Sequence, residues 1–234
     1  MRIKATGNIA KITKAMKMVA AAKLRQVQDR NELARPFTNG AKSFLEPYQE
    51  VIDGLPTDRV LKHLVVPLTG DRGLCGSINT NVGKYVSAML AADDNDEVSI
   101  IAIGQKGQDA MHKVAPSKTT VSFRDVGKVP MNFAQACLCA EDIVNAEFDK
   151  ATIVFTHFQN ALTQTPMSFT VPSKSLIEEF PEALEDYEFD TDNEAMLSME
   201  DLVEFQIASL CVGGAPSLCR RVVPSVLDTE PCLH

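Results

Sequence analysis

The stretch MRIKATGNIAKITKAMKMVAAAKLRQVQDRNELAR, residues 1–35, opens the chain and decides how the rest must be arranged. It contains no proline and one glycine, and its apolar residues recur in steps of four and three at Ala5, Ile9, Ile12, Met16 and Val19. This spacing predicts one helix with a coiled-coil seam that turns polar farther along, at Lys23, Gln26 and Arg30. A helix of about 34 residues would extend roughly 50 Å. It must therefore project from its domain or lie across a large partner, although an ordinary amphipathic packing helix is the simpler alternative.

Charge is divided unevenly between this segment, which we call the arm (residues 1–35), and the rest of the chain. The arm holds nine Lys or Arg residues against Asp29 and Glu32, a net charge of +7. The whole chain of 234 residues carries −8, so the other 199 residues carry −15. A basic arm on an acidic body indicates that the arm faces an acidic partner, nucleic acid or a membrane surface.

Several functional classes find little support in the composition. The six cysteines form no CxxC pair, and the four histidines stand apart from them, so we expect free thiols and no zinc site. No apolar run is long enough to span a bilayer. The basic N-terminus has no serine before Ser43, unlike a transit peptide.

Beyond the arm, the period of the apolar residues changes from helical to alternating and back. Pro36, Asn39 and Gly40 predict a break, with a second helical segment from Ala41 to Ile52. Strands are then expected at 61–69, 98–103, 119–123, 151–158 and 167–171, with helices at 77–92, up to residue 114, and from a cap at Asn132 to about 146. This alternation predicts an α/β fold with a largely parallel sheet, closed at one edge by a hairpin through residues 164–166.

Residues 173–234 are less regular. Residues 173–192 are acidic and interrupted by Pro181, which predicts irregular structure. A capping box at Ser198 predicts a helix that Cys211 and the following glycines stop. We therefore divide the chain into five parts. These are the long N-terminal helix with the helical segment that follows it at 1–58, an α/β base domain at 59–172, an acidic linker at 173–197, the start of a C-terminal helix at 198–210 and an atypical tail at 211–234.

The glycine-rich turn GDRGLCG, residues 70–76, follows a predicted strand and precedes a predicted helix. Its G-x-x-G-x-x-G spacing differs from the dinucleotide fingerprint, and Asp71 would repel a phosphate, so a tight structural turn is favoured over a phosphate site. Cys75 has no histidine or acid nearby in sequence to activate it. The carboxylates at 93–97 and 178–192 have the density of a solvated surface.

Nucleic-acid and membrane binding by the arm remain alternatives. The arm has no aromatic residue to stack on bases, and its lysines are spread around the helix. Its apolar face is narrow and rich in alanine, with no aromatic anchor for a lipid surface.

Two motifs in the same order resemble those of the gamma subunits of F-type ATP synthases. IAKITKAMKMVAAAKL, residues 9–24, looks like the N-terminal helix of that family, and residues 70–76 match its S-D-R-G-L-C-G turn except for Gly70. FRDVG at 123–127 and LVEFQ at 202–206 are also similar to mitochondrial-type members. The likeness extends from residue 1 to about residue 210.

The resemblance implies a non-catalytic rotor shaft in which two long helices form an antiparallel coiled coil above a Rossmann-like α/β base domain. Its partners would be the alpha and beta subunits, the epsilon or delta subunit beside the base, and the membrane c-ring. The location would be the matrix side of the mitochondrial inner membrane, peripherally bound, with no cofactor, no metal and no nucleic acid. The contacts with the hexamer and the coiled-coil seam would come from Ile9, Ile12, Lys11, Lys14, Met16, Lys17, Val19, Ala20, Lys23 and Arg25. The family turn would comprise Asp71, Arg72, Gly73, Leu74, Cys75 and Gly76.

The resemblance ends before the C-terminal helix of the family, whose motifs do not occur after Leu210. We therefore expect the antiparallel partner helix to be absent, which would leave the arm seam exposed and impair assembly as a rotor. We expect this sequence to carry no presequence ahead of the arm. Two alternatives remain at this stage: a free-standing α/β enzyme that binds a nucleotide or phosphate at residues 70–76, and a gamma isoform without rotor competence.

Overall fold

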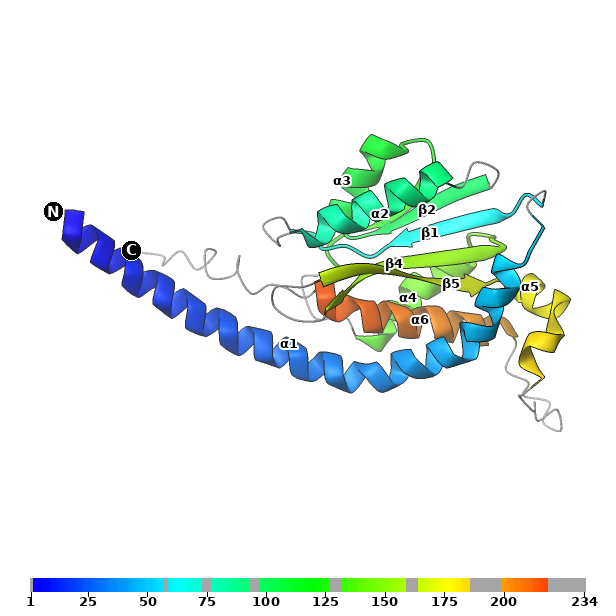
Figure 1. Ribbon diagram of the computed structural model, residues 1–234, viewed down its shortest axis with the longest axis horizontal. Coiled ribbons are helices and arrows are strands. Elements are labelled where there is room, and N and C mark those ends of the chain that lie inside the picture. The colour runs from blue at the N-terminus through cyan, green and yellow to red at the C-terminus, as the bar shows by residue number, and fades with distance from the viewer. Residues whose placement is uncertain are drawn as a thin grey trace.

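The computed structural model describes residues 2–56, 59–72, 77–92, 97–126, 132–158, 164–185 and 199–218. It consists of a long projecting helix, α1, and a layered α/β body into which the C-terminal end of that helix is built (Figure 1). This arrangement confirms the α/β fold expected from the alternating periods.

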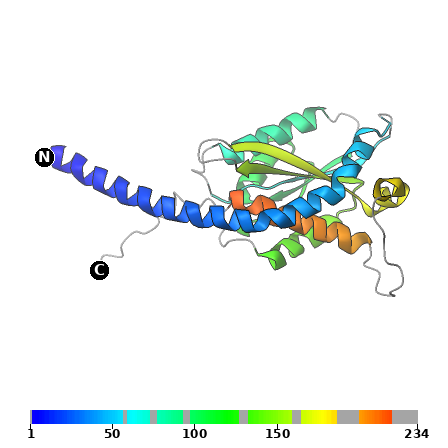
Figure 2. The same ribbon diagram turned by 60° about the horizontal axis from the view of Figure 1, so that its bottom comes forward.

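Helix α1 runs without interruption from Arg2 to Asp53, over 52 residues. The predicted break at Pro36, Asn39 and Gly40 is therefore wrong. Proline costs about 3 kcal/mol inside a helix, because it lacks the amide hydrogen and crowds the preceding turn. Pro36 and Pro47 both lie within α1, and the helix curves along its length instead of ending (Figures 1 and 2). The long helical stretch before Pro36 and the buried packing after it outweigh the local cost.

The sheet has five strands in the order β3-β2-β1-β4-β5. The strands are β1 (Lys62–Pro67), β2 (Glu97–Ile103), β3 (Thr119–Phe123), β4 (Lys150–Phe158) and β5 (Gln164–Pro172). Neighbouring strands are parallel except β4 and β5, which pair antiparallel from Lys150 opposite Pro172 to Phe158 opposite Gln164. The antiparallel edge is confirmed, but residues 164–166, where we expected the connection, are part of β5.

Helices cover both faces of the sheet. Helices α2 (Ile78–Ala92) and α3 (Gln105–Val114) lie on one face, and α4 (Phe133–Val144), α6 (Met199–Leu218) and the end of α1 lie on the other (Figure 1). The first face encloses a small core of Val65, Val82, Val86, Val98, Ile100, Met111 and Val154. The second holds the larger core, which includes Leu45, Tyr48, Leu64, Ile101, Ile143, Ile153, Val203 and Ile207. The end of α1 is thus part of the hydrophobic core of the body.

Local sequence signals explain where the shorter helices begin. Asn132 and Gln135 form the capping box of α4, since each side chain accepts a hydrogen bond from the other residue's amide. Ser173 caps α5 (Lys174–Glu179), and Pro181 opens the 3-10 turn η2 (Pro181–Leu184). The prediction of irregular structure is wrong for residues 174–179 and 181–184, because they form α5 and η2, and these elements bury Leu176, Ile177 and Leu184.

Helix α6 also differs from its prediction. It continues through Cys211 to Leu218 instead of stopping at residue 211. Leu210 and Cys211 are fully buried. Their packing in the core stabilises the helix even though the glycines that follow favour a break. The predicted cap at Ser198 and the tail after Leu218 lie outside the described residues.

Candidate functional site

The arm extends away from the body in two views of the molecule (Figures 1 and 2). Its predicted seam faces solvent: Ile9 is 64% exposed, Ile12 56% and Val19 45%, while Met16 is half-buried. These four residues are spaced three, four and three apart, which places them on one face of the helix. The described part of the body therefore leaves Ile9, Ile12 and Val19 uncovered on this face of the arm.

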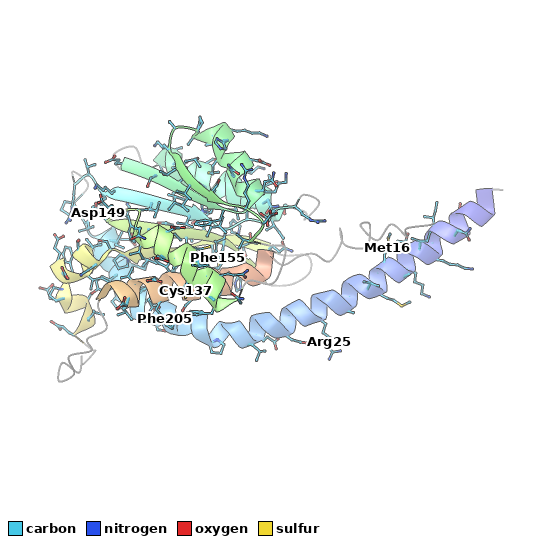
Figure 3. The ribbon with its side chains drawn as sticks, turned by 180° about the vertical axis from the view of Figure 1, so that it is seen from behind. Met16, Arg25, Cys137, Asp149, Phe155 and Phe205 are labelled. Carbon is cyan, nitrogen blue, oxygen red and sulfur yellow. The ribbon has the colours of Figure 1, made fainter. Side chains whose placement is uncertain are left out.

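Basic side chains accompany this stripe. Lys11, Lys14, Lys17 and Arg25 are all exposed. Figure 3 shows Arg25 and Met16 on the stretch of α1 that lies clear of the body. The side chains of Ala20 and Lys23 lie outside the described set. A helix with an apolar stripe and surrounding cations fits an acidic partner surface with an apolar centre.

The C-terminal part of α1, which we call the root of the arm, is held in the body by Leu45 and Tyr48. Both side chains are fully buried. They pack in the same core as Val203, Ile207 and Leu210 of α6. Burial raises the pKa of Tyr48 to about 12, because the phenolate would lose its hydration. A continuous helix carries this fixed root directly into the exposed arm.

Polar contacts on either side hold the same root. The Gln49 side-chain amide donates a hydrogen bond to the carbonyl oxygen of Thr170 on β5. Beyond the end of α1, the guanidinium of Arg59 binds both carboxylate oxygens of Glu179 on α5, at 2.8 and 2.9 Å. The hydrogen bond from Arg59 lowers the pKa of Glu179 below its usual range. These contacts join the end of α1 to β5, and the segment after α1 to α5.

The predicted turn at residues 70–76 is described at Gly70, Asp71 and Arg72, and the other four residues lie outside the description. Asp71 Oδ1 accepts hydrogen bonds from the amides of Gln105, at 3.1 Å, and Asp125, at 3.0 Å. Asp125 has a φ of 64°, in the left-handed region. The carboxylate thus joins the loop after β1 to the loops after β2 and β3.

The same loop packs very closely against the start of α3. The amides of Gln105, Lys106, Gly107 and Gln108 donate to Asp71, Gly70, Thr69 and Gly104, at 3.1, 3.1, 2.6 and 3.2 Å respectively. A Cβ atom on Gly104, whose φ is 95°, would lie 2.0 Å from the carbonyl oxygen of Thr69. The first four amides of α3 therefore bind the protein itself, and a phosphate would have to displace Asp71, Gly70 and Thr69 to reach the first three of them. This geometry favours the structural reading of the turn over the phosphate-binding alternative.

The described thiols are poorly suited to nucleophilic chemistry. Burial raises the pKa of Cys139 to about 11 and also raises the pKa of Cys211. Cys75 lies outside the described residues. Among the side chains that the structure describes, no three potential metal ligands gather in one place. The helices in that part of the chain are all too short or too polar to cross a bilayer.

The chain thus consists of an α/β body and a basic helix that projects from it with exposed apolar residues, an architecture suited to binding a partner through the helix. The sequence predicted the long N-terminal helix but not that its C-terminal part is buried in the body. Nothing in the local pattern distinguishes Leu45 and Tyr48 from other apolar positions of an amphipathic helix. The sequence also predicted too short a length for α6.

Comparisons with known proteins identify the family. The ATP synthase family description matches residues 1–216. The mitochondrial ATP synthase subunit gamma of Arabidopsis thaliana is 36% identical over 216 residues, which cover 88% of this chain and 64% of that protein. The ATP synthase gamma chain of Pelagibacter ubique is 33% identical over 214 residues, covering 84% and 73% respectively. The chain therefore belongs to the gamma-subunit family of ATP synthases.

A solved structure agrees with this assignment. A chain in the cryo-EM structure of the Tetrahymena thermophila mitochondrial ATP synthase central stalk and c-ring superposes with a TM-score of 0.71 at 25% identity, over 93% of this chain and 98% of that one. The chain spans 64% of the length of the Arabidopsis relative and 65% of that of the Ipomoea batatas relative.

Proposed function

We propose that this chain is the central-stalk subunit of an ATP synthase, in which the arm is the part of the rotor that enters the catalytic hexamer. Rotation would be coupled to catalysis because an asymmetric rod presents a different surface to each surrounding subunit and stabilises a different conformation in each. The chain itself would supply no catalytic group and hold no cofactor.

The observation that carries this proposal is the contrast between the two ends of α1. The same 52-residue helix is exposed at Ile9, Ile12 and Val19 of the arm and fully buried at Leu45 and Tyr48. A rod that transmits torque must be stiff and must not turn in its socket. The continuous helix meets the first requirement, and the packing and hydrogen bonds at its root meet the second.

We propose the following contacts for the arm. Lys11, Lys14, Lys17 and Arg25, together with Lys23, would face acidic surfaces of the alpha and beta subunits, while the small residues around Ala20 would allow close approach. Ile9, Ile12, Met16 and Val19 would form the seam of the stalk. Helix α6 runs antiparallel to the C-terminal part of α1 (Figure 1). The seam on the arm would extend this antiparallel helix pairing farther along α1. Residues 1–58 would serve as the shaft and residues 59–172 as the base.

The partners of the base follow from the family. The Tetrahymena relative was solved as central stalk with c-ring. We propose that the α/β body rests on an equivalent ring, with an epsilon or delta subunit beside it, as a peripheral component on the matrix side of the mitochondrial inner membrane. Mitochondrial gamma subunits among the relatives support this location.

Assembly with a hexamer that lacks its own gamma subunit tests the proposal. The purified chain is mixed with an alpha-beta hexamer, and binding is followed by co-elution and by single-particle imaging of the central cavity. We expect the Lys11→Glu, Lys14→Glu, Lys17→Glu variant to bind at least about tenfold more weakly, because three cations are replaced by anions.

The matched control carries Lys84→Glu, Lys113→Glu and Lys118→Glu, which make the same charge change at exposed positions of the body. This control should bind like the unaltered chain. Equal binding by the arm variant, or density for the chain outside the central cavity, would contradict the proposal.

A further inference from the structure

One surface of the body combines exposed apolar side chains with acidic ones. It lies on α4 and α6, and we call it the α4/α6 face, defined by Phe133, Cys137, Leu138, Phe205 and the acidic residues of the two helices. Phe133 is 40% exposed, Leu138 64% and Phe205 44%, and the rings of Phe133 and Phe205 lie 5.7 Å apart. Figure 3 shows Cys137 and Phe205 near one another on this side of the body. Exposed aromatic pairs of this kind are typical of interaction surfaces.

The charge of this face is unusual for the molecule. Helix α4 contains Glu141 and Asp142, helix α6 contains Asp201 and Glu204 among its described side chains, and neither helix contains a lysine or arginine. On the opposite side of the sheet, α2 and α3 carry Lys84, Lys106 and Lys113 against the single acid Asp109. Exposed apolar side chains on two helices that carry acids and no lysine or arginine suit a basic, amphipathic helix.

A helix of that chemistry is present in the same molecule. The arm exposes Ile9, Ile12 and Val19 along one face and Lys11, Lys14 and Lys17 around it. Its own α4/α6 face is out of reach, because α1 is one unbroken helix that leaves the body and points away from it (Figures 1 and 2). Only the arm of another copy can approach the face without breaking α1.

We propose that the chain, when it is not in a hexamer, self-associates by laying the arm of one copy on the α4/α6 face of another. Reciprocal exchange of arms closes a dimer, in which each copy contributes one arm and one face. The contact uses the exposed seam and cations of the arm, so it competes with any partner that binds the arm. It requires only the two described surfaces and does not depend on the rotor function proposed above.

The test is sedimentation velocity of the full chain over about 1 to 100 µM, the range in which small interfaces associate. We expect the weight-average sedimentation coefficient to rise with concentration at low salt. Raising the salt from about 50 mM to about 500 mM should weaken the association at least tenfold, because surface charges are then screened. A monomer at every concentration and salt would overturn the proposal.

A charge exchange identifies the surfaces. One variant carries Lys11→Glu and Lys14→Glu on the arm, and the other carries Glu141→Lys and Asp142→Lys on the face. Each variant alone should remain monomeric, since arm and face then have charge of the same sign. An equimolar mixture should associate again, because the acidic arm meets the basic face and the native arm meets the native face in the same pair.

Two further variants serve as controls. Lys84→Glu with Lys113→Glu makes the same charge change as the arm variant on the opposite side of the body, and it should self-associate like the unaltered chain. Leu138→Ser removes the most exposed apolar side chain of the face and should weaken association severalfold without changing the charge. Thermal unfolding of each variant shows that it is folded.

Every alternative result counts against the proposal. A dimer that survives both charge variants is formed by other surfaces, and a mixture that stays monomeric shows that arm and face do not meet. Loss of association in the opposite-side control means that overall charge, not this face, governs it.

Discussion

Replacing Leu45 by alanine should loosen the root of the arm while leaving the arm itself unchanged. Leu45 is fully buried where α1 enters the main core. Truncating a fully buried leucine costs about 2 to 5 kcal/mol, through lost transfer free energy and the cavity left behind. At about 2 to 4 °C per kcal/mol for a domain of this size, a loss of about 3 kcal/mol lowers the Tm by roughly 6 to 12 °C.

The matched control is Leu33→Ala in the same helix, because Leu33 is 78% exposed. Its expected effect on the free energy of unfolding lies within about 0.5 kcal/mol. Thermal and urea denaturation, followed by circular dichroism, measure both variants. Hydrogen exchange resolved by mass spectrometry should also show faster exchange around Ile207 of α6 in the Leu45 variant alone. Similar Tm shifts for the two variants would refute the reasoning that the body grips α1 at its root.

Three other predictions concern the body. Gly104→Ala should lower the free energy of unfolding by at least about 1 to 3 kcal/mol in urea denaturation, because its φ is 95° and the added Cβ meets the carbonyl of Thr69; an unchanged midpoint would contradict this. Glu179→Gln should flatten the acid side of the profile of stability against pH. Arg59 lowers the folded-state pKa of Glu179, so the stability that this carboxylate contributes is present above its unfolded-state pKa and is lost as the pH falls through its folded-state pKa. Denaturation of both proteins between about pH 7 and about pH 3 measures the difference. Alkylation of Cys139 at about pH 8 should be far slower in the native protein than in urea, since burial raises its pKa to about 11; equal rates, measured by mass spectrometry, would argue against that burial.

Local sequence signals predicted most of the body correctly. The strand at residues 119–123 was expected with the bounds that β3 has, and Asn132 caps α4 as expected. These elements depend on period-two or helical apolar spacing and on a side-chain cap, which are properties of neighbouring residues. The antiparallel edge was likewise predictable, because a short connection between two strands can only form a hairpin.

The errors share a different cause. Pro36 and the glycines after Cys211 are local helix breakers, yet both lie inside helices. Their intrinsic cost of about 1 to 3 kcal/mol is smaller than the gain from burying several large side chains. Residues 174–184 were expected to be irregular for the same local reason, and packing orders them instead.

The candidate site divides in the same way. The sequence by itself determined that residues 1–35 form a basic helix with an apolar stripe, because charge and spacing can be read without knowing the neighbours. Only the tertiary structure decided that this stripe is exposed, that Leu45 and Tyr48 anchor the helix, and that Asp71 binds the amides of two other loops. Burial and hydrogen bonding between residues far apart in the chain depend on how the layers pack, and a linear pattern does not contain that information.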